Sequence, residues 1–170
     1  MPKPSEDQKY LEAALSELKD YLLSDTLFYP LMGNLPRLTI GGLLLAQKRL
    51  DVENLGTHLD PKLAAVKNKW RAAWAKKAAQ ELDARLNLWR NYLNDYRANP
   101  EAHAENYQYE IRWRVMVELL TKEVDQIPEE ISALDGLLRT KFILGEFVWE
   151  ENLQSQFPQD EFWFLYGRLS

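Results

Sequence analysis

Apolar residues recur every three or four positions along most of this chain, and strict alternation of apolar and polar residues is nearly absent. Spacing by three and four places side chains on one face of an α-helix, whereas alternation indicates a half-buried strand. We therefore predict an all-α fold of five to seven helices. The expected helices are one with its apolar stripe at Leu11–Leu22, residues 40–50 capped by Thr39, residues 62–99, a fourth from Pro100, a fifth from Pro128, and residues 158–166.

The third predicted helix dominates the architecture. Residues 62–99 contain neither Gly nor Pro, and Asp60-Pro61 and Asn99-Pro100 bracket them. One straight helix of this length would extend about 57 Å, whereas a compact domain of this size is only about 40 Å across. The helix must kink, run the length of an elongated bundle, or project toward a partner. We predict an elongated bundle around this central helix, with one domain over residues 1–170.

Residues 142–150 have two interpretations. Gly145-Glu146 lies between two β-prone triplets, which suits a type II′ hairpin. Alternatively, Phe142, Gly145 and Trp149 continue a helical stripe. We favour the helix, because an isolated hairpin of three-residue strands is marginally stable.

The start of the second predicted helix contains an unusual pair, Gly41 and Gly42, after Thr39. Each Gly costs about 1 kcal/mol relative to Ala inside a helix, so we expect the pair to admit another helix backbone. Bare N–H groups at a helix start also bind anions. The Leu43-Leu44-Leu45 run that follows favours a packed helix end over an anion site.

The residue types argue against most common chemistries. The chain has no cysteine and two histidines, which excludes thiolate and three-histidine metal sites. Gly-rich phosphate loops and the Gly-x-Ser-x-Gly motif are absent. We therefore predict no catalytic residue, metal or cofactor, and we favour a non-enzymatic protein over the alternative of an enzyme whose site is dispersed along the sequence. The start MPKPSEDQKY has no apolar core, and polar residues interrupt the apolar stretch 27–46. A cytoplasmic protein without a membrane span is expected.

Charge is distributed unevenly along the chain. Net charge is −5, but residues 37–90 carry 11 basic and 5 acidic side chains (+6), and residues 101–170 carry 6 and 14 (−8). A helix edge rich in Lys and Arg binds phosphates, so it is a candidate nucleic-acid surface. The interleaved Trp70 and Trp74 lie on the hydrophobic stripe. The candidate basic surface comprises Lys62, Lys69, Arg71, Lys76 and Lys77.

Aromatic residues are concentrated near the C-terminal end, with eight in residues 142–166. On a helix, Phe162, Trp163 and Phe164 would span about 200°, so we expect either burial in a groove or one ring facing a partner. Aromatic side chains often anchor interfaces. The leading hypothesis is a helical interaction or assembly protein that binds itself or another protein. The alternatives are nucleic-acid binding through the basic helix edge, or a small-molecule-binding bundle with an aromatic pocket.

Overall fold

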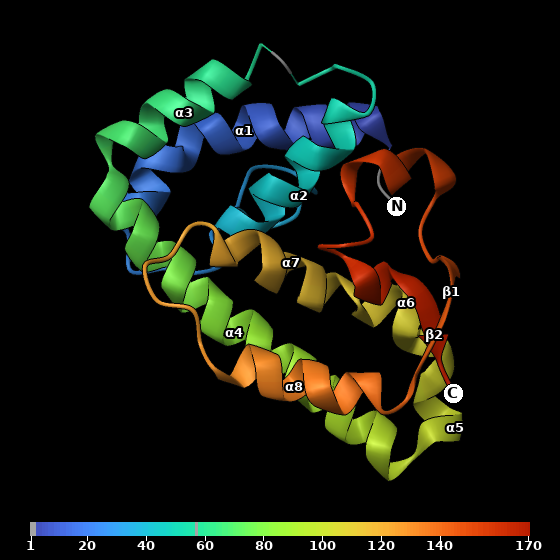
Figure 1. Ribbon diagram of the computed structural model, residues 1–170. Helices are drawn as coiled ribbons and strands as arrows, with labels where there is room; N and C mark the ends of the chain where they lie inside the picture. The colour runs from blue at the N-terminus through green and yellow to red at the C-terminus, as the bar shows by residue number, and fades with distance from the viewer. Residues whose placement is uncertain (1–2, 57) are drawn as a thin grey trace.

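The computed structural model describes residues 3–56 and 58–170, and most of them are helical (Figure 1). The predicted helical character is therefore confirmed, but a small sheet is also present. The α-helices are α1 (Pro4–Leu23), α2 (Ile40–Asp51), α3 (Asp60–Lys69), α4 (Arg71–Ala98), α5 (Pro100–His103), α6 (Tyr107–Glu110), α7 (Arg112–Thr121) and α8 (Glu130–Arg139). The remaining elements are the 3₁₀ helices η1 (Ala104–Asn106), η2 (Glu151–Gln156) and η3 (Trp163–Leu165), and the strands β1 (Phe142–Phe147) and β2 (Tyr166–Leu169).

Helix α7 lies in the middle of the arrangement, with α2 on one side and α4 on the other (Figure 1). Residues from Arg114 to Val117, together with Leu119 and Leu120, are all buried, so every side of α7 is covered. A helix that is covered all round belongs to the interior, whereas α4 keeps one polar face exposed. The predicted long helix is therefore a neighbour of the central element.

The predicted long helix breaks at Trp70, between α3 and α4. Trp70 leaves the helical region of backbone conformation, with φ −115° and ψ 40°. Neither Gly nor Pro marks this position, so tertiary packing sets the break. Both α3 and α4 contact α1, and a bend allows both segments to pack against it. Of the three outcomes expected for this stretch, the structure shows the kink.

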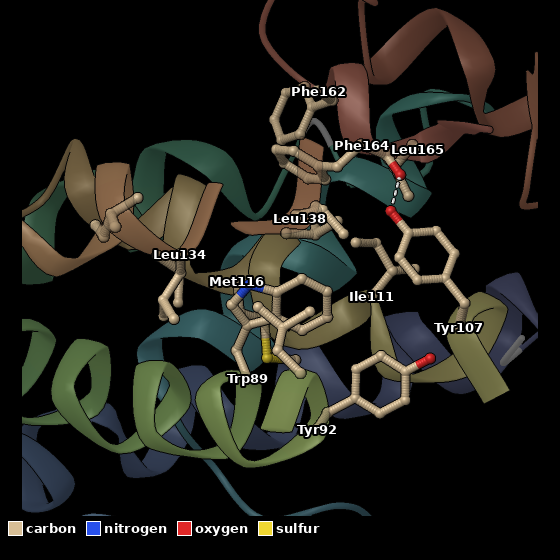
Figure 2. Packing of buried hydrophobic residues seen from close by; sticks show 14 of the residues in the cluster. Trp89, Tyr92, Tyr107, Ile111, Met116, Leu134, Leu138, Phe162, Phe164 and Leu165 are labelled. Atoms are coloured by element: carbon tan, nitrogen blue, oxygen red, sulfur yellow. Dashed lines mark hydrogen bonds between the residues drawn. The ribbon is translucent and has the colours of Figure 1, made fainter. Parts of the chain in front are cut away.

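Buried apolar side chains form two clusters. The first gathers side chains from α4, α6, α7, α8 and the C-terminal segment, and Figure 2 shows part of it. The second gathers side chains from α1, α2, α3 and the first half of α4. Leu82 and Leu120 belong to the second cluster, whereas Leu86 and Leu119 belong to the first. Helices α4 and α7 thus link the two clusters.

The C-terminal segment differs from the prediction. Residues 142–147 form a strand, and their partner is the end of the chain: β1 pairs antiparallel with β2, Phe142 opposite Leu169 and Leu144 opposite Gly167. The favoured helix and the local hairpin are both wrong. The last predicted helix, residues 158–166, is also wrong, because only η3 is helical there. Local sequence signals missed both strands because their pairing spans about twenty residues.

Gly167 makes this pairing possible. A Cβ at this position would lie 2.2 Å from the Ile143 carbonyl oxygen and 2.5 Å from the Phe142 ring. Gly167 is therefore a point of close approach within the sheet. Gly145 lies in a register shift between Leu144 and Phe147.

Candidate functional site

A cleft of about 1230 Å³ opens between the start of α1, the loop joining α1 to α2, and the segment from η1 to α7. The loop contributes Phe28 and Met32, and α7 contributes Arg112 and Trp113. The loop is tied at its base by two backbone hydrogen bonds between Tyr29 and Leu38, of 3.1 and 2.7 Å. This cleft brings together segments that are far apart in the sequence.

Five side chains along the cleft alternate between rings and guanidinium groups. The Arg112 guanidinium carbon lies 3.4 Å from the Tyr109 ring centroid and 3.8 Å from that of Trp113. The Arg85 guanidinium carbon lies 5.0 Å from the Trp113 centroid and 5.1 Å from that of Phe28. We call Tyr109, Arg112, Trp113, Arg85 and Phe28 the cation–π ladder. Because each such contact contributes about 0.5–2 kcal/mol, the ladder holds its rings and charges in fixed places.

Arg85 forms an ion pair with Glu81, which lies one turn earlier on α4. The Glu81 carboxylate is fully buried. Its Oε1 accepts the Gly41 N–H at 2.8 Å, and its Oε2 accepts Arg85 Nε at 3.1 Å. Arg85 Nη2 also donates to Thr39 Oγ1 at 3.3 Å. The N-terminus of α2 therefore does bind an anion, and that anion is a side chain of the same protein.

The glycine pair serves this arrangement. A Cβ on Gly41 would lie 2.4 Å from Glu81 Oε2, and one on Gly42 would lie 2.7 Å from the Tyr10 hydroxyl. The expectation that the pair admits another helix backbone is wrong, because it makes room for two polar side chains. The predicted cap is confirmed, since Thr39 Oγ1 accepts the Gly42 N–H at 2.9 Å.

Tyr10 fixes the loop against the cleft by donating its hydroxyl to the Arg37 carbonyl at 3.0 Å. Burial raises the pKa of Tyr10 above its usual value, and the nearby Glu81 charge adds to the effect. The phenol therefore stays protonated and remains a hydrogen-bond donor well above neutral pH.

The cleft carries an excess of positive charge, with five basic and three acidic side chains in its wall. Arg49 holds Asp7 through two hydrogen bonds of 2.9 Å, and Arg85 is paired with Glu81. By contrast, Arg37 and Arg112 form no ion pair within the described residues. Burial lowers the pKa of Arg112, while Tyr109 and Glu110 oppose this shift. The wall thus presents two guanidinium groups that form no ion pair within the described residues, and it also contains the carboxylates of Glu6 and Glu105.

The candidate basic surface is only partly assembled. Lys62, Lys69, Arg71 and Lys76 are exposed, but the break at Trp70 separates the first two from the others. Lys77 is buried: its Nζ donates to the Thr26 carbonyl at 2.6 Å and lies 4.8 Å from the Tyr21 ring centroid. Burial also lowers the pKa of Lys77. Lys77 therefore anchors the loop after α1 and is not part of an exposed edge.

The candidate partner surface is largely internal. Phe162 and Phe164 are fully buried, as Figure 2 shows for their rings. Trp163 is half-buried, with its ring edge-on to Phe142 and the Arg139 guanidinium 3.7 Å from its centroid. Because the backbone here is a turn and a 3₁₀ helix rather than an α-helix, two of the three rings reach the core.

Sequence reasoning did not find the cation–π ladder. The Tyr109 side chain is 64% exposed, and Trp113 is half-buried. The spacing Tyr109, Arg112, Trp113 follows the helical i, i+3, i+4 pattern and is a signal that the sequence offers. Phe28 and Arg85 reach the ladder only through the tertiary fold, so no local pattern indicates them.

Neither histidine enters the cleft wall: His58 is exposed before α3, and His103 is half-buried at the end of α5. Across residues 3–56 and 58–170, no group of three or more His, Asp or Glu side chains is arranged to hold a metal ion. None of the helices in that part of the chain is both long and apolar enough to cross a membrane.

Comparison with protein-family models, curated proteins and solved structures finds no match to this chain.

Proposed function

We propose that this protein binds a small organic anion in the cleft between the α1–α2 loop and α6–α7. The supporting observation is that Arg37 and Arg112 line the cleft without an ion-pair partner within the described residues. Ligand sites are concave, mostly apolar, and carry a few polar groups that orient the ligand. This cleft has that composition.

Arg112 is the main anchor in this proposal. A guanidinium has five N–H donors in a planar fork that matches carboxylate and phosphate groups. Only one hydrogen bond of the Arg112 side chain is present within the described residues, from Nη1 to the Tyr109 carbonyl at 3.2 Å. The remaining donors are free for a ligand, and the two flanking rings hold the guanidinium plane in place.

The apolar part of the wall supports an organic anion over an inorganic one. Met32, Leu35, Leu45 and Met116 line the cleft alongside the ladder. An inorganic ion gains nothing from such a surface, whereas each apolar Å² that a ligand covers contributes about 25 cal/mol. A ligand with an acidic end and an apolar body uses both parts of the wall.

Thermal unfolding tests this proposal with a panel of millimolar organic phosphates and carboxylates, each paired with its neutral analogue. A ligand present at 100 times its Kd stabilises the fold by about 2.7 kcal/mol, which is about 5–10 °C for a protein of this size. Arg112→Gln should abolish the shift, whereas the matched exposed control Lys62→Gln should keep it. The proposal fails if no anion shifts the midpoint more than its neutral analogue does.

A second candidate function is self-association through β1. Leu144 is 68% exposed beside the exposed Ile143, and β1 has only β2 as a strand partner in the described part of the chain. An uncovered strand edge is a template for pairing with another strand. Light scattering at micromolar concentration tests this: a dimer that Leu144→Lys converts to monomer supports it, and a monomeric unmodified protein refutes it.

A further inference from the structure

We infer that the anion bound in the cleft is a mononucleotide, with its base stacked on Tyr109 and Trp149 and its phosphate held by Arg112 and Arg37. This inference rests on the proposed function and deepens it. It requires the cleft to offer a stacking surface, partners for the polar edge of a base, and an anchor for phosphate.

Two aromatic side chains supply the stacking surface. Arg112 lies against one face of the Tyr109 ring, and within the described residues no other ring or guanidinium contacts Tyr109. Trp149 lines the same cleft, and its orientation is set by a hydrogen bond from Nε1 to the Gln108 carbonyl, at 3.0 Å. Bases stack on Tyr and Trp rings and on guanidinium planes. Tyr109 is exposed, and Trp149 is half-buried with its ring edge-on to Phe157, so each ring has a part that a base in the cleft can reach.

Amide side chains line the same cleft as these rings. Asn34, Asn106 and Gln108 all line the cleft, and within residues 3–56 and 58–170 their side chains make no hydrogen bond. A carboxamide donates and accepts at once, so it pairs with the donor and acceptor edge of a nucleobase. A simple organic acid has no group that needs such partners.

The charge and size of the cleft complete the argument. Two guanidinium groups without an ion pair in the described residues suit a phosphate, which accepts several hydrogen bonds and carries more charge than a carboxylate. The volume of about 1230 Å³ lies above the usual range of about 300–1000 Å³ for small-ligand pockets. A base, a sugar and a phosphate occupy such a space better than a short acid does.

Isothermal titration with AMP, adenosine and ribose 5-phosphate separates the parts of the ligand. We expect AMP to bind at least about tenfold more tightly than ribose 5-phosphate, because stacking of the base contributes to affinity. Adenosine should bind more weakly than AMP by a similar factor, because it lacks the phosphate.

Two variants assign the ends of the ligand. Tyr109→Ala should weaken AMP binding about tenfold more than it weakens ribose 5-phosphate binding, because the ring stacks on the base and also flanks the Arg112 guanidinium. Arg112→Gln should weaken both. Ile127→Ala is the matched control, since Ile127 is 61% exposed, close to the 64% of Tyr109, but lies outside the cleft. Circular dichroism of each variant shows whether the fold is retained.

The outcomes distinguish this inference from the proposed function. If ribose 5-phosphate binds as tightly as AMP, the base is not recognised and the inference is overturned, while anion binding stands. If only carboxylates of the earlier panel bind, the inference fails in the same way. If a tetranucleotide binds more than about tenfold tighter than AMP, the ligand is a strand, which also overturns the inference. If no anion binds, both proposals fail.

Discussion

Replacing the buried Glu81 with Ala should lower the free energy of unfolding by more than replacing an exposed acidic residue of the same helix does. The Glu81 carboxylate is fully buried and accepts hydrogen bonds from the Gly41 N–H and from Arg85. Its removal leaves the Arg85 guanidinium, only 7% exposed, without a counter-charge. It also leaves the N-terminus of α2 without its internal anion.

The expected magnitude follows from this burial. Breaking a buried ion pair by removing one partner costs about 3–5 kcal/mol. Arg85 keeps its contacts with Thr39, Phe28 and Trp113, so we expect the lower end, about 3 kcal/mol. For a chain of this length that corresponds to a loss of about 6–12 °C in Tm.

Urea unfolding followed by tryptophan fluorescence measures the effect. Asp83→Ala is the matched control, because Asp83 is exposed on the same helix, and it should cost less than about 0.5 kcal/mol. In a double-mutant cycle with Arg85→Ala, the double variant should lose at least about 1 kcal/mol less than the sum of the single losses. Our reasoning is refuted if Glu81→Ala costs as little as Asp83→Ala, or if the two losses simply add.

Three further predictions concern glycines and tyrosines. Gly41→Ala should cost at least about 1 kcal/mol despite the better helix propensity of Ala, because its Cβ would lie 2.4 Å from Glu81 Oε2. Gly136→Ala is the control for this change, since nothing lies within 4 Å of the added Cβ, and urea midpoints should show a gain of up to about 1 kcal/mol. Gly167→Ala should cost about 1–3 kcal/mol, because its Cβ would lie 2.2 Å from the Ile143 carbonyl oxygen; a urea midpoint equal to that of the unmodified protein would contradict this. Burial raises the pKa of Tyr10, Tyr21, Tyr92 and Tyr107. Tyrosines in the unfolded chain ionise near pH 10, whereas these four stay protonated in the folded protein, so unfolding at higher pH releases protons. Their contribution to the free energy of unfolding is therefore fully present below about pH 10 and decreases as the pH rises above it. Urea midpoints between pH 7 and 11 that show no decline would contradict this expectation.

The sequence by itself determined the features that arise within one helical turn. Thr39 caps α2 as predicted, because a cap needs only its own hydroxyl and an N–H three residues later. The fifth predicted helix is α8, and Ile131, Leu134 and Leu138 are buried on one face as their spacing indicates. Such features depend on neighbours three or four residues away, and the sequence shows those neighbours directly.

The tertiary structure decided features that depend on distant partners. Neither Gly nor Pro interrupts the sequence around Trp70, yet the helix breaks there, and both α3 and α4 pack against α1. The β-prone residues 142–147 found their strand partner at the end of the chain, and the aromatic run at 162–164 entered the core. Each of these features depends on a partner that is distant in the sequence, so the local preference of the backbone does not indicate it.

The candidate site shows the same division. Tyr109, Arg112 and Trp113 share a local pattern that the sequence contains, but their exposure in a cleft does not follow from that pattern. Arg85 of α4 contacts both Phe28 of the α1–α2 loop and Trp113 of α7, and these contacts form only when the three segments pack together. Glu81 and the Gly41 N–H are forty residues apart. No periodicity links such positions, because the contacts between them exist only after the helices have been placed.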